Sequence, residues 1–123
     1  MPPTRAGFSP LQRLHTSKEF GRVFAEASRS ADQFFTVLAR PNTRNVARLG
    51  LTISRRAARR AVDRNRLKRL ARESFRMHRQ LPDWDFVVMA KPLAAASGSA
   101  LLRQSLDQHF ERLRQKAVLG RDG

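Results

Sequence analysis

The 123-residue chain has no cysteine and no tyrosine, and it has a single tryptophan. The absence of cysteine excludes disulfides, thiolate metal sites and a cysteine nucleophile, and it is compatible with a reducing compartment. No apolar run approaches the roughly 18 residues that span a bilayer. The opening segment MPPTRAGFSPLQRLHTS also lacks the apolar stretch of a secretory signal. We therefore expect a cytoplasmic protein without a membrane partner.

Negative charge is also scarce. The chain has 10 acidic residues against 25 basic ones, which gives a formal net charge of +15. Eleven of the basic residues fall within residues 55–79, together with only two acids, Asp63 and Glu73. Like charges repel one another in a compact state, so a strip of this kind indicates a polyanionic partner, and nucleic acid is the commonest. Arginine outnumbers lysine 21 to 4, which suits phosphate recognition but is explained equally well by the codon usage of a GC-rich genome.

Length and hydrophobic periodicity predict one domain, residues 1–123, with a basic arm over 1–14 and a frayed tail over 117–123. The patterns predict helices at 16–27, 60–78 and 99–116, and strands at 33–39, 48–54 and 85–90. Three strands and three helices in this order favour an α+β two-layer sandwich, in which the helices pack on one face of a small mixed sheet.

The segment RLGLTIS, residues 48–54, alternates between two kinds of side chain. One face of the predicted strand carries the large apolar residues Leu49, Leu51 and Ile53. The other face carries Arg48, Gly50, Thr52 and Ser54. We therefore expect one face to belong to the core and the other to be small, polar and open to a ligand or to water.

Residues 60–78 change to a helical period with two dissimilar sides. One arc is mostly apolar and contains Leu67, Leu70, Ala71, Ser74, Phe75, Met77 and His78. The opposite arc contains Asn65, Arg66, Lys68, Arg69, Arg72, Arg76 and Arg79, with Arg64 at the border. An ordinary solvated face would carry acids at i,i+4, which are largely missing here. Membrane-surface binding is less favoured because the core needs the apolar side. So dense a positive charge predicts recognition of backbone and shape, which suits a folded RNA.

Independent catalysis is not predicted. His15, His78 and His109 have no acid or nucleophile at a productive spacing. Asp83 and Asp85 flank the start of a strand, where acids are ordinary turn residues. The sequence has no glycine-rich phosphate loop and no metal-ligand cluster.

Residues 50–76, GLTISRRAARRAVDRNRLKRLARESFR, resemble the signature of the protein subunit of bacterial ribonuclease P. The core of the match is the run from Arg64-Asn65-Arg66 to Phe75-Arg76, preceded by paired arginines. The order of the flanking elements agrees over roughly residues 13–115. The resemblance implies a left-handed βαβ crossover around the arginine-rich helix, although nearly all crossovers are right-handed.

The resemblance also implies a function: support of the endonucleolytic 5′ maturation of precursor tRNA. In this family a large RNA is the catalyst and Mg²⁺ is held mainly by that RNA, so the protein is expected to bind no metal of its own. The implied partners are the catalytic RNA and the 5′ leader of precursor tRNA. The oligomeric state is left open.

Site residues follow from the match position by position. The expected contacts to RNA are Arg55, Arg56, Arg59, Arg60, Arg64, Asn65, Arg66, Lys68, Arg69, Arg72 and Arg76. The expected leader cleft lies between the first helix and the open sheet face, and it is lined by Phe20, Phe24, Phe35, Val37 and Thr52. On the first strand we favour the Phe35 side over the side of Phe34, Thr36 and Leu38. Aromatic side chains can stack bases without demanding a sequence, although core packing is the commoner role for Phe20 and Phe24.

Two other functions fit the charge. A ribosomal or other structural RNA-binding protein would co-sediment with ribosomes, whereas a free-standing nuclease would cut RNA without an added RNA component.

Overall fold

A computed structural model describes residues 18, 20, 21, 23 and 27–122 of the chain. Its elements, in chain order, are β1 (Ser28–Ala31), β2 (Phe35–Pro41), β3 (Arg48–Thr52), α2 (Ala61–Met77), β4 (Trp84–Ala90), α3 (Pro92–Ala95) and α4 (Ser99–Asp122). Residues 18, 20, 21 and 23 are also helical, in agreement with the predicted first helix. The basic arm and the rest of that helix, including Phe24, lie outside the described residues.

The four strands form one mixed sheet in the order β1-β2-β4-β3. β1 pairs antiparallel with β2, and β2 antiparallel with β4, while β3 and β4 are parallel. Because parallel neighbours need a long connection, α2 crosses over between β3 and β4. The predicted α+β architecture with a mixed sheet is confirmed. The left hand of the crossover stays a prediction.

Two features differ from the sequence prediction. β1 was not predicted, because it is a short edge strand of sequence SRSA whose inward side chain, Ser30, meets His109 of α4 rather than an apolar residue. A polar strand of this length carries no alternating apolar signal. In addition, α4 continues to Asp122 instead of ending near Lys116, so the predicted tail is helical as far as that residue.

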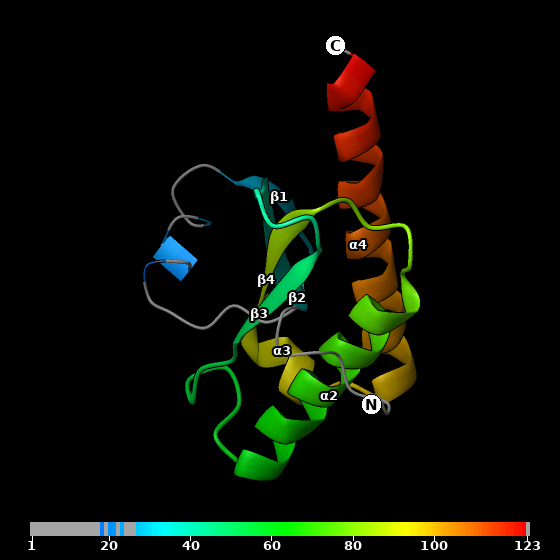
Figure 1. Ribbon diagram of the computed structural model, residues 1–123. Coiled ribbons are helices and arrows are strands. Elements are labelled where there is room, and N and C mark those ends of the chain that lie inside the picture. Colours follow the sequence, from blue (N-terminus) through cyan, green and yellow to red (C-terminus); the bar gives the residue numbers. More distant parts are fainter. Residues whose placement is uncertain (1–17, 19, 22, 24–26, 123) are drawn as a thin grey trace, which may run out of the picture.

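One face of the sheet forms the main core with α2 and α4 (Figure 1). Phe75 of α2, Phe86 of β4 and Phe110 of α4 meet edge to face, with ring centroids 5.8–6.0 Å apart. Edge-to-face pairs are favoured because the positive rim of one ring meets the negative face of the next, and each adds about 0.5–1.5 kcal/mol to the burial term. This aromatic cluster ties both long helices to the centre of the sheet.

The opposite face is not bare. Val23 is fully buried there against Val87, and Phe20, Ala27, Leu38 and Met89 pack around the pair. The helical residues near the N-terminus therefore lie across the sheet from α4, as Figure 1 shows. The prediction of helices on one face only is wrong: strands β2 and β4 are central, and their near-continuous apolar runs are covered on both sides.

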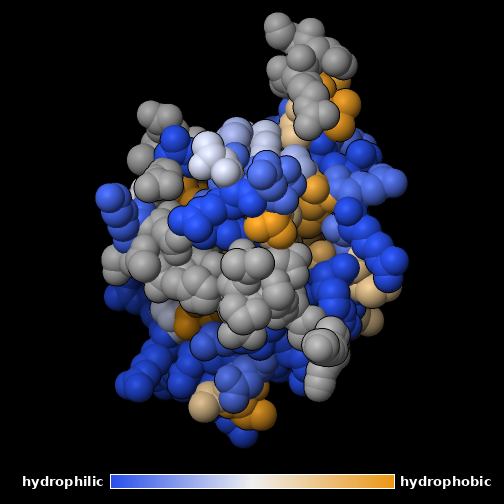
Figure 2. Space-filling model, in the orientation of Figure 1, coloured by the Kyte–Doolittle hydropathy of each residue, from blue (hydrophilic) through white to orange (hydrophobic). Residues whose placement is uncertain are grey.

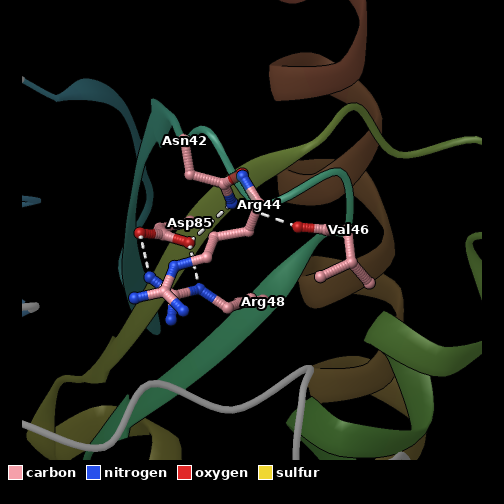
Figure 3. A network of polar contacts seen from close by, with 5 residues as sticks. All are labelled: Asn42, Arg44, Val46, Arg48 and Asp85. Carbon is pink, nitrogen blue, oxygen red and sulfur yellow. Dashed lines mark hydrogen bonds and ion pairs between the residues drawn. The ribbon is translucent and has the colours of Figure 1, made fainter.

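Arg48 and Gly50 were expected on an open face, but both are buried. Arg48 Nε lies 2.8 Å from Asp85 Oδ1, and its Nη2 lies 2.9 Å from Asp85 Oδ2. Asn42 Nδ2 donates to the same Oδ1 at 2.7 Å and to the carbonyl of Val46 at 3.1 Å (Figure 3). The network fastens the loop after β2 over the start of β4. Arg48 is therefore part of the framework.

Candidate nucleic-acid interface

The basic surface consists of the outward side of α2 and the approach loop, residues 53–60, which leads into it. In the approach loop, Ala57 and Ala58 are buried. The amide of Ala57 donates to Ser54 Oγ at 3.1 Å, and that of Ala58 donates to the Ser54 carbonyl at 3.0 Å. With the small residues turned inward, the loop exposes its four arginines: Arg55, Arg56, Arg59 and Arg60.

The inward side of α2 agrees with the predicted arc, since Leu67, Leu70, Ala71, Ser74 and Phe75 are buried. Met77 is an exception: it is 60% exposed, because it is the last residue of α2 and the helix extends past the core there. His78 is half-buried, and its Nδ1 lies 2.8 Å from the Ser74 carbonyl.

The outward side of α2 carries the predicted cations at two depths. Asn65, Arg69 and Arg76 are exposed, whereas Arg64, Arg66, Lys68 and Arg72 are half-buried. Arg64 and Arg66 also bond to the protein itself. Arg64 Nη1 donates to the carbonyls of Ala58 and Arg59, and Arg66 donates to Ser99 Oγ and to the carbonyl of Ala95. No sequence pattern predicted these contacts, because their partners lie in a loop and at the ends of distant helices.

The acids near this surface neutralise little of it. Glu73 lies 3.8 Å from Arg69 Nε and 3.6 Å from Arg103 Nη1, and all three side chains are at least 30% exposed. Ion pairs this long and this solvated contribute at most about 1 kcal/mol. Hydrophilic residues dominate the lower part of Figure 2, where the approach loop and the start of α2 lie in Figure 1. The positive end of the α2 dipole adds to the attraction for anions there.

The second face of the sheet is where a single strand was expected to bind. The register aligns Thr36, Met89 and Thr52 across three strands. Thr52 is exposed, and Phe20 is half-buried nearby in the group that contains Met89. This row agrees with the predicted placement of Thr52 and Phe20 on the same face.

Phe35 and Val37 do not lie there. Both are fully buried in the core with α2 and α4, so the expectation that they line the cleft is wrong. Leu38 lies on the Phe20 side instead. The error has a physical cause: both sides of β2 are covered, so its pattern of apolar residues does not distinguish one face from the other.

A serine, a histidine and an aspartate meet elsewhere in the fold. His109 Nδ1 lies 2.7 Å from Ser30 Oγ, and Nε2 lies 3.1 Å from Asp32 Oδ2. His109 is fully buried and Ser30 is 6% exposed, so no substrate can reach the hydroxyl. Burial lowers the pKa of His109 below its usual 6.5, against the opposing effect of Asp32. This group joins β1 to α4 and is not an active site.

Among the described residues, no three His, Cys, Asp or Glu side chains are grouped so that they could hold a metal ion. No helix in the described part of the chain is long and apolar enough to cross a membrane.

Comparisons with known proteins agree on one family. The family model described as Ribonuclease P matches residues 8–114. The ribonuclease P protein component of Methylococcus capsulatus is 50% identical over 105 residues, which cover 85% of this chain and 82% of the relative. That of Thioalkalivibrio sulfidiphilus is 46% identical over 108 residues, covering 87% of this chain and 90% of the relative.

Solved structures agree as well. The RNase P protein of Staphylococcus aureus superposes with a TM-score of 0.76 at 26% identity, covering 81% of this chain and 93% of that one. The RNase P protein of Thermotoga maritima gives a TM-score of 0.72 at 28% identity, with coverage of 81% and 96%.

Proposed function

Because the chain belongs to the ribonuclease P protein family, which acts in the 5′ maturation of tRNA as part of a ribonucleoprotein, we propose that it works by docking its basic surface on the RNA of that particle. The observation that carries the proposal is the concentration of exposed arginines on the approach loop and α2. Each phosphate contact releases counterions, and this supplies affinity without reading bases. The proposed place of action is the cytoplasm.

The chemistry is proposed to belong to the RNA. Hydrolysis needs a positioned acid, base or metal. Among the described acids, Asp85 is bonded to Arg48 and Asn42, and Asp32 accepts hydrogen bonds from backbone amides and from Ser105. These carboxylates do not fit a Mg²⁺ site. We therefore place Mg²⁺ on RNA phosphates and assign the protein the tasks of binding and orientation.

The 5′ leader of precursor tRNA is the proposed ligand of the second sheet face, beside Phe20 and Thr52. Thr52 is exposed on β3 at the edge of the sheet, and Gly50 precedes it without a side chain. A flexible strand can approach such a floor closely. A base stacked on Phe20 would contribute about 1–3 kcal/mol regardless of sequence.

Reconstitution tests the proposal. The chain is purified from its host, the RNA bound to it is sequenced, and cleavage of a precursor tRNA is measured with and without that RNA. We expect one large RNA to be recovered and the precursor to be cut only when the RNA is present. Recovery of ribosomal RNA would instead indicate a structural ribosomal protein, and cleavage by the chain alone would indicate a free-standing nuclease.

A further inference from the structure

Arg64 reaches back from the first turn of α2 to the approach loop. Its Nη1 amino group donates to two consecutive carbonyls, those of Ala58 and Arg59, both at 2.9 Å. The helix itself begins without a side-chain cap, since the side chain of Arg60 makes no capping hydrogen bond. Arg64 therefore holds the end of the loop against the helix where a capping residue is missing.

Arg66 reaches in another direction. Its Nη1 donates to Ser99 Oγ at 3.1 Å and its Nη2 to the carbonyl of Ala95 at 3.3 Å. Ala95 is the last residue of α3 and Ser99 the first of α4. Arg66 thus connects α2 with the junction between the two helices that follow β4.

The spacing explains why the two arginines diverge. Successive residues of an α-helix are rotated by about 100°, so residues 64 and 66 point about 200° apart, with residue 65 between them. Asn65 is accordingly exposed, while both neighbours are half-buried. Arg69 is 59% exposed at the side chain and is paired only loosely with Glu73, at 3.8 Å.

We propose that Arg64 and Arg66 are positioning residues, not phosphate ligands. Arg64 holds the approach loop so that its arginines face the RNA, and Arg66 sets the orientation of α2 against α4. Contact with RNA falls to the exposed groups, Asn65 and Arg69 among them. The inference rests on the proposed docking of this surface on RNA, but its first test requires no RNA.

The first test is limited proteolysis of the free, full-length chain. Trypsin cleaves after arginine, so the four arginines of the approach loop report its opening directly. In Arg64→Gln, cleavage within residues 55–60 should accelerate roughly tenfold, the factor for an opening equilibrium that loses about one charge-assisted hydrogen bond. The matched control, Arg69→Gln on the same helix, should leave these cleavage rates unchanged. Equal rates in wild type and Arg64→Gln would overturn the role assigned to Arg64.

A second measurement separates positioning from direct contact. Affinity for the catalytic RNA is compared in a double-mutant cycle, with Arg64→Gln made in wild type and in a background in which Arg55, Arg56, Arg59 and Arg60 are all glutamine. If Arg64 acts through the loop, its substitution weakens binding in wild type and has little effect in that background. Additive effects would mean that Arg64 contacts phosphate itself, and the inference fails.

For Arg66 the readout is hydrogen exchange. In Arg66→Gln, the amides of the first turn of α4, residues 99–102, should exchange several-fold faster, because that turn loses its connection to α2. Arg69→Gln serves again as the control. Unchanged exchange in Arg66→Gln would overturn this half of the inference. Failure of the proposed function would instead appear as an absence of RNA binding by the wild-type chain, with both free-protein results intact.

Discussion

The imidazole of His109 lies between Ser30 and Asp32, with Nε2 3.1 Å from the Asp32 carboxylate and Nδ1 2.7 Å from the Ser30 hydroxyl. A neutral ring with its proton on Nε2 can donate to Asp32 and accept from Ser30. Asp32 Oδ2 also accepts a hydrogen bond from Ser105 at 2.5 Å. The group joins the edge strand and its turn to α4, and it makes the stability of the fold depend on pH.

Stability should fall in mildly acidic solution. Burial lowers the pKa of His109, with Arg112 and Lys91 adding to the effect and Asp32 opposing it. The unfolded chain then binds a proton near pH 6.5, where the folded chain does not. The contribution of His109 to the free energy of unfolding is constant above pH 6.5 and decreases as the pH falls below it. Urea unfolding at several pH values from 8 to 5 measures the slope.

His109→Gln is the control for that slope. It should flatten the dependence between pH 7 and 5, because the titrating ring is gone, whatever the substitution costs in absolute stability. If wild type and variant have parallel profiles, His109 does not titrate differently in the two states.

A second decrease in stability is expected in stronger acid. Burial opposes it, but hydrogen bonds from Ser105 and from the amides of Phe35 and Phe34 lower the pKa of Asp32 from 3.8 to about 2. This stabilisation is complete above the unfolded value and disappears as the pH falls from 3.8 toward 2. Asp32→Asn should lack the acid transition in this range, as measured by thermal unfolding at pH 2–4.

Arg48→Met should be strongly destabilising. It leaves the Asp85 carboxylate, 3% exposed, without its ion-pair partner, and breaking one side of a buried pair costs about 3–5 kcal/mol. The double variant Arg48→Met/Asp85→Leu should recover much of that stability, because no charge remains buried. Equilibrium unfolding in urea checks both, and a double variant no more stable than the single one would contradict this account.

Phe20→Ala tests the leader cleft. It should weaken binding of leader-bearing precursor tRNA to the assembled enzyme by about 1–3 kcal/mol, the value of one stacked base, and leave binding of mature tRNA unchanged. Filter binding or fluorescence titration with both RNAs measures the difference. An equal decrease in affinity for the two RNAs would remove the cleft assignment.

Arg69→Gln tests whether α2 touches RNA directly. The slope of log K against log salt should become shallower by about 0.7–0.9, the value expected for a single phosphate neutralised by one arginine. Arg112→Gln removes an exposed arginine of α4, away from the basic surface, and should leave the slope unchanged. An unaltered slope in Arg69→Gln would count against its role in binding RNA.

The sequence alone determined much of this protein, because hydrophobic period is a local property. The run of Leu67, Leu70 and Phe75 at helical spacing defined both sides of α2, and the alternation around Leu49 defined β3. The density of arginine in residues 55–79, together with the family pattern, was enough to predict an RNA partner.

Tertiary structure decided whatever depends on residues distant in the chain. The apolar pattern of β2 could not assign Phe35 to a face, since β2 is central and covered on both sides. The burial of Arg48 required Asp85, which lies 37 residues further along the sequence. The inward reach of Arg66 required Ser99, 33 residues away. An arginine in a sequence indicates a surface charge, and only folding brings the carboxylate or carbonyl that makes it part of the framework.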